Sequence, residues 1–213
     1  MILALTACSG GGGGSGGETV TGSASASVGG ATSGNARPVD SPFTLSQLNQ
    51  AIPSRLAAPD GWSLTGPFAD DGSKAQDKCA RQPLPSCVGI SAIVSADLVK
   101  SDSRGDTNAH FELYAFDSLD NAKVRMKEQL KDHKAQEGNS TPLTISVPGS
   151  DDAYAYAQSG GSGERFETTV FRVGTVVVLV FARGLPSDHD LSSFARLQAE
   201  RLTIAAAGRN PDA

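Results

Sequence analysis

Residues 165–183 read RFETTVFRVGTVVVLVFAR, and this stretch decides the fold. It divides into two runs rich in β-branched and aromatic residues, 165–173 and 175–183, which flank Val173 and Gly174. A glycine between two such runs is typical of a tight hairpin turn. The second run is apolar at neighbouring positions as well as alternate ones, which indicates a strand covered on both faces. We therefore expect residues 175–183 near the centre of a sheet.

Further strands are expected before this hairpin. Residues 88–99 are rich in β-branched side chains, and residues 108–116 alternate between polar and apolar positions. The polar loop 101–106 between them predicts a second hairpin. Two shorter strands are expected at 143–147 and 153–158.

Residues 118–136 show the clearest helical pattern. Ser118 suits the N-cap position, and Asp120 lies in the first turn, where the helix dipole favours an anion. One side of this helix repeats apolar residues at helical spacing and should pack on the sheet. The other side carries four lysines that we expect to be solvated, the alternative being that they bind an anion or a polymer: Lys123, Lys127, Lys131 and Lys134.

Two further helices complete the predicted fold. Thr44 and Gln47 match a capping box and predict a short helix before Pro53. Residues 187–205 predict a last helix with an apolar inner side. Hairpins dominate this order of elements, which indicates an α+β fold. We expect an antiparallel sheet of about five to six strands with helices packed on one face.

The composition divides the chain into parts. Residues 9–39 are rich in Gly, Ser, Ala and Thr and lack apolar periodicity, so we expect a disordered tether there. Residues 40–206 are long enough for a single α+β domain with its own core. Residues 207–213 are expected to form a disordered tail.

The charge pattern excludes one class of partner. The formal net charge is −5, and the sequence contains no basic block. We therefore expect no nucleic-acid partner, since such proteins concentrate lysine and arginine on one face.

The N-terminus resembles the lipobox of bacterial lipoproteins. Residues 5–8 read Leu-Thr-Ala-Cys, and a Ser/Gly run follows Cys8 directly. The resemblance implies that residues 1–8 end a signal peptide, with cleavage after Ala7 and a lipid on the Cys8 thiol. Only seven residues precede Cys8 and none is charged, so we expect the true start to lie further upstream. Two or three acyl chains would anchor such a protein stably at a membrane.

The remaining cysteines form an even pair. Once Cys8 is assigned to lipid, Cys79 and Cys87 remain, and the segment between them contains two prolines. An exported protein meets an oxidising compartment, so we predict a disulfide between them. A zinc site is the alternative, but it needs closer cysteine spacing and further ligands, and the histidines are scattered.

Three motifs resemble catalytic or phosphate-binding sites, but each has a simpler structural explanation. Residues 188–190 read Asp-His-Asp, but adjacent side chains rarely converge as a triad does, so a helix cap and first turn are expected. Asp151 and Asp152 are expected in a turn. The glycine-rich residues 160–163 join two strands and lack the helix N-terminus of a phosphate cradle. We therefore predict no catalytic residue, no metal site and no cofactor.

From about Phe43 to Leu202 the layout resembles secreted lipoproteins of actinobacteria and the extracytoplasmic sensor-like domains of some receptor Ser/Thr kinases. The resemblance rests on AFDSLDNA at 115–122, GSDDAY at 149–154, FRVGTVVVLV at 171–180 and the helix ending in Arg201 and Leu202. These motifs mark the fold rather than an active site. The sensor-like domains are thought to bind an unknown ligand in a cleft, but they carry more disulfides than this chain can form, and no binding residue is carried over.

These observations lead to an expected function. We expect a lipoprotein anchored on the extracytoplasmic face of the cell membrane through Cys8, with a non-enzymatic domain that binds or senses an unknown small ligand or an envelope protein. The alternatives are a structural lipoprotein that docks on a partner protein, and an envelope hydrolase. A deep apolar pocket would favour the first reading, an exposed apolar patch the second, and titratable residues clustered in a cleft the third.

Overall fold

The computed structural model describes six stretches of the chain: residues 41–81, 86–102, 105–135, 140–160, 163–185 and 188–213. Cys8 and the predicted tether 9–39 lie outside the described residues, so their predicted roles stay predictions. The described residues belong to one compact unit.

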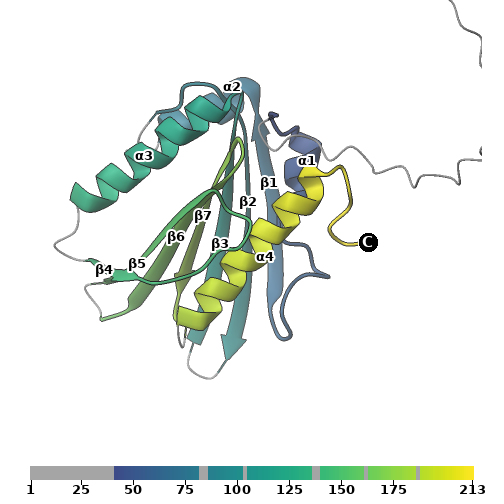
Figure 1. The fold of residues 1–213 in the computed structure, drawn as a ribbon. Coiled ribbons are helices and arrows are strands. Elements are labelled where there is room, and N and C mark those ends of the chain that lie inside the picture. The colour runs from purple at the N-terminus through teal and green to yellow at the C-terminus, as the bar shows by residue number, and fades with distance from the viewer. Residues whose placement is uncertain (1–40, 82–85, 103–104, 136–139, 161–162, 186–187) are drawn as a thin grey trace, which may run out of the picture. The chain divides into compact units, whose positions relative to one another are not determined.

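One antiparallel sheet of seven strands forms the framework, in the order β1-β2-β3-β7-β6-β5-β4 (Figure 1). It consists of two meanders that meet where β3 pairs with β7. The strands are β1 (Ser63–Asp71), β2 (Ile90–Asp102), β3 (Gly105–Phe116), β4 (Ser140–Leu143), β5 (Asp152–Ser159), β6 (Arg165–Val173) and β7 (Val176–Arg183). The predicted α+β class with an antiparallel sheet is confirmed, with seven strands rather than five to six.

Strand β7 occupies the central position in this order, as its continuous apolar sequence predicts. It pairs with β6 through a tight turn in which Val173 faces Val176. Gly174 in this turn has φ +57°, a left-handed conformation that glycine adopts without a steric penalty. The hairpin at 165–183 therefore forms where the sequence predicts it.

The helices cover both faces of the sheet, and the expectation of helices on one face is wrong. Helices α1 (Leu45–Ala51) and α4 (Asp188–Ala206) pack on one face, which we call the α4 face. Helices α2 (Gly72–Ala80) and α3 (Leu119–Ala135) pack on the opposite face, the α3 face. In Figure 1, α4 crosses the strands beside α1, and α3 lies apart from both.

Strand β3 shows why two helical layers are needed. Side chains alternate between the faces of a strand. Phe111 and Leu113 belong to the apolar core on the α4 face. Tyr114 and Phe116 belong to a second, smaller core on the α3 face. Because both sets are buried, a helix must cover each side of the sheet.

Two aromatic residues anchor the core of the α4 face. Trp62 follows a turn in which its amide donates to the Pro59 carbonyl. Its ring meets Phe194 edge to face, with centroids 4.9 Å apart, and Phe194 meets Phe111 in the same way at 5.9 Å. Trp62 therefore packs against the core of the α4 face and is itself partly buried.

The first strand and second helix have weak sequence signals and were not predicted. Strand β1 contains Pro67, which cannot donate to a ladder, and its pairing with β2 shifts register between Thr65 and Phe68. As an edge strand it tolerates this interruption. The fourth strand also differs from expectation, because β4 ends at Leu143, where the predicted strand 143–147 begins.

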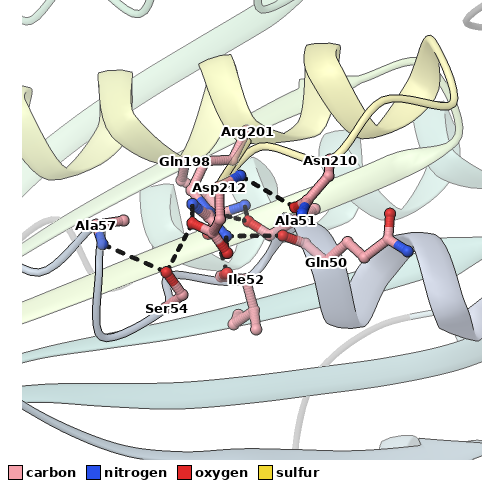
Figure 2. Close-up of polar contacts among 9 residues, drawn as sticks. All are labelled: Gln50, Ala51, Ile52, Ser54, Ala57, Gln198, Arg201, Asn210 and Asp212. Atoms are coloured by element: carbon pink, nitrogen blue, oxygen red, sulfur yellow. Dashed lines mark hydrogen bonds and ion pairs between the residues drawn. The ribbon is translucent and has the colours of Figure 1, made fainter.

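The last residues do not behave as the disordered tail predicted for 207–213. Arg201 is buried, and its guanidinium donates to the carboxylate of Asp212, with Nη1 and Oδ1 2.6 Å apart (Figure 2). The Ser54 hydroxyl donates to the same oxygen at 2.7 Å. A buried cation needs an anionic partner, and Asp212 provides it by folding the tail back.

Candidate functional site

A groove lies between helix α3 and strand β5, and we call it the α3 groove. Its volume is about 280 Å³. This size lies near the lower end of small-molecule pockets, which occupy about 300–1,000 Å³. The groove is lined by Lys123, Met126, Lys127 and Leu130 of α3 and by Asp152, Ala153 and Tyr154 of β5.

Helical spacing builds the α3 wall of the groove. Residues four apart lie on the same side of a helix. Met126 and Leu130 form the apolar part, and Met126 also belongs to the core of the α3 face. Lys123 and Lys127 are also four residues apart, so they form a second row along the helix. Both side chains are exposed, as the sequence predicts. Their position beside β5 could not be predicted, because the fold rather than the local pattern places β5 opposite the helix.

The β5 wall carries an aromatic stack. Tyr154 and Tyr156 lie two residues apart on one face of β5, with ring centroids 6.3 Å apart and planes at 13°. His133 of α3 stacks on Tyr156 with a centroid distance of 3.6 Å. This stack joins the C-terminal half of α3 to the sheet, which holds the two walls of the groove in position.

The Tyr154 hydroxyl is a buried polar group with no hydrogen-bond partner among the described residues. Burial raises the pKa of Tyr154 far above its ordinary value, the neighbouring Tyr156 acts in the same direction, and Arg125 opposes them. The phenol therefore remains a protonated donor. A buried hydroxyl without a partner costs about 1–3 kcal/mol.

The acidic side chain of the groove is already paired. Arg172 of β6 is buried, and its Nη2 lies 3.0 Å from Oδ2 of Asp152. Its Nη1 lies 2.8 Å from Oδ2 of Asp151, which also accepts from the Gly174 amide. The two neighbouring carboxylates are therefore held by one guanidinium and are not arranged as an acid/base pair.

A chain of polar contacts links helix α2 to strand β3 on the α3 face. Lys78 lies 3.6 Å from Glu112, whose other carboxylate oxygen accepts from the Tyr114 hydroxyl at 2.5 Å. The guanidinium carbon of Arg125 sits 4.6 Å from the centre of the Tyr114 ring. Arg125 is only 2% exposed, so it places a buried positive charge beside the groove.

A second polar cluster lies further along the α3 face. His110 Nδ1 is 3.0 Å from Asp97 Oδ1, and Asn108 donates to the same oxygen at 3.3 Å. A histidine oriented by a carboxylate is two thirds of a hydrolytic triad. Among the described residues, no serine or threonine hydroxyl hydrogen-bonds to His110, so the cluster lacks a positioned nucleophile.

A second hollow lies beside the C-terminal tail, with a volume of about 330 Å³. Two of its charged residues, Arg201 and Asp212, are already engaged with each other. Arg201 donates to the carbonyl oxygens of Gln50, Ala51 and Ile52 as well as to Asp212. These carbonyls lie at the end of helix α1, where backbone acceptors have no partner within the helix, and Gln198 also donates to the Ala51 carbonyl. The arrangement caps a helix, so Arg201 and Asp212 are not available to a ligand.

The structure also bears on the cysteines, on metal binding and on membrane-spanning helices. The structure contains a disulfide between Cys79 and Cys87, with Cα atoms 5.9 Å apart. Cys8 lies outside the described residues. In the part of the chain that the structure describes, no group of His, Cys, Asp and Glu side chains is placed to hold a metal ion. In the same part, no helix combines the length and the apolar character needed to span a membrane.

Comparison with known proteins identifies a structural relative. The extracellular domain of PknH from Mycobacterium tuberculosis matches with a TM-score of 0.57 over 76% of this chain and 98% of that domain. The two sequences are 15% identical, so the match shows a common fold. Neither a scan against protein-family models nor a search of curated proteins found a match. The expected resemblance to the extracytoplasmic domain of a receptor kinase is therefore shown at the level of the fold.

Proposed function

We propose that this chain is a membrane-anchored extracytoplasmic lipoprotein whose domain binds or senses a small ligand in the α3 groove without catalysing a reaction. Lipid on Cys8 would hold it at the membrane, and residues 9–39 would act as its tether. The shared fold with the extracellular domain of PknH supports an extracytoplasmic role. The Cys79–Cys87 disulfide supports the same compartment, because such bonds persist in oxidising environments.

The groove is the observation that carries the binding role. It combines an apolar floor with a few polar groups, the usual composition of a small-molecule site. A hydrolytic role has less support, because the Asp97–His110 pair has no positioned hydroxyl among the described residues.

The binding role can be tested with an uncharged apolar probe. We would titrate the full chain carrying Cys8→Ser with N-phenyl-1-naphthylamine and follow its fluorescence. Leu130→Glu places a charge on the apolar floor, so we expect it to weaken probe binding at least about tenfold.

The matched control lies on the same helix. Val124 is 44% exposed and does not line the groove, so Val124→Glu introduces the same charge away from it. We expect this variant to bind the probe like the parent chain. Equal binding by the parent chain and the Leu130→Glu variant would refute the groove as the site. Melting temperatures of both variants would show whether the fold is kept.

A further inference from the structure

We propose that the ligand of the α3 groove is a small anionic amphiphile, with a carboxylate or phosphate beside Lys123 and Lys127 and an apolar body over Met126 and Leu130. This inference rests on the proposed binding function and names the chemistry of its ligand.

The two rim lysines leave positive charge available. Lys127 has no ion-pair partner among the described residues. Lys123 lies 4.0 Å from Asp120, but these side chains are 53% and 94% exposed, so water screens the pair. An anion placed between the two amino groups would therefore meet charge that the protein has not already neutralised.

The other charges around the groove favour the same sign of ligand. Asp152 is the acidic residue in the lining, and the buried guanidinium of Arg172 holds it at 3.0 Å. Arg125 adds a buried positive charge whose influence reaches Tyr154, where the negative charge of Asp132 opposes it more weakly. The lining itself holds two lysines and one aspartate, so a cationic ligand would meet more positive than negative charge there.

The apolar residues limit the rest of the ligand. Met126, Leu130 and the ring of Tyr154 lie together in a volume of about 280 Å³, enough for one ring or a short hydrocarbon chain. A purely apolar ligand would leave the two lysines of the lining without a partner.

Three probes with one hydrocarbon chain separate charge from apolar contact. At pH 7 decanoate is anionic, decan-1-ol is neutral and decylamine is cationic. We would measure their dissociation constants for the full chain carrying Cys8→Ser by isothermal titration calorimetry. The expected order of affinity is decanoate, then decan-1-ol, then decylamine.

A double variant with reversed charges tests the role of the two lysines. Lys123→Glu combined with Lys127→Glu should weaken decanoate binding at least about tenfold and strengthen decylamine binding, with decan-1-ol changed less than about threefold. Lys131→Glu combined with Lys134→Glu makes the same change of net charge on the same helix outside the groove. This control should alter decanoate affinity less than about threefold.

The outcomes distinguish the two proposals. If decanoate and decan-1-ol bind equally well, or if both double variants weaken decanoate equally, the anionic ligand is refuted. The binding function would still stand if Leu130→Glu abolished decan-1-ol binding. If the parent chain binds none of the three probes, both proposals are overturned.

Discussion

Arg201 and Asp212 determine how the C-terminus of the chain is held. The guanidinium of Arg201 is buried against the last carbonyl groups of α1, and the carboxylate of Asp212 supplies its counter-charge. Ser54 adds a hydrogen bond to the same carboxylate. One aspartate therefore links the tail, helix α4 and the segment after α1.

Replacing Asp212 should destabilise the folded state. Asp212→Asn keeps the shape of the side chain but removes the charge opposite Arg201. We expect the free energy of unfolding at pH 7 to fall by about 2 kcal/mol, which corresponds to a melting temperature lower by about 4–8 °C. Asp60→Asn, an exposed carboxylate in a turn, is the control and should change stability by less than about 0.5 kcal/mol. Similar melting temperatures for the two variants would contradict this role.

The same pair gives a pH dependence with a definite sign. The hydrogen bond from Arg201 holds the pKa of Asp212 below its ordinary value, although desolvation opposes this effect. Because the folded pKa is the lower one, the stabilisation is complete above the unfolded pKa of about 3.9 and disappears as the pH falls through the folded pKa. The stability difference between parent and Asp212→Asn should therefore persist at neutral pH and shrink below about pH 4.

At the scale of elements, α2 depends on a covalent link. Ala75 and Cys79 of this nine-residue helix are buried in the core of the α3 face. The disulfide joins the end of α2 to Cys87, just before β2. It should therefore hold a short helix that has few apolar residues of its own.

Removing this disulfide should lower stability by a predictable amount. Cys79→Ala combined with Cys87→Ala, in the Cys8→Ser chain, should reduce the free energy of unfolding by about 2–3 kcal/mol, as expected for a short closed loop. Urea denaturation would measure it. The parent chain treated with a reducing agent should match the variant, and an unchanged denaturation midpoint in both cases would contradict the structural role of the bond.

Strong local patterns predicted most elements. The alternation at Phe111 and Leu113, the capping box at Thr44 and the apolar run of β7 each correspond to an observed element. Segments with weak local patterns were not predicted correctly, because long-range contacts determine their structure. Strand β1 forms at an edge despite Pro67, and the tail is held by Asp212, whose distant partner no local pattern reveals.

The candidate site was predictable only in part. The lysine row and the apolar stripe of α3 follow from helical spacing. Their meeting with Tyr154 does not, because the two segments are brought together by the second meander of the sheet. The pairing of Asp151 and Asp152 with Arg172 depends on the same long-range register.

At the scale of the molecule, the two faces of the sheet have different roles. The α4 face holds the larger apolar core and the capped C-terminus. The α3 face holds the smaller core, the disulfide and the groove. Such a domain could meet a ligand through one face while the other maintains the fold, and a lipid at Cys8 would keep both near the membrane.

The membrane anchor is most directly tested by intact mass. The chain would be expressed in a bacterium that processes lipoproteins, with a complete signal sequence ahead of Leu5, beside a Cys8→Ser variant. We predict a membrane-bound product whose mass equals a chain beginning at Cys8 plus its acyl groups, and loss of membrane retention in the variant. An unacylated product that keeps residues before Cys8, with both proteins in the same fraction, would contradict the anchored lipoprotein.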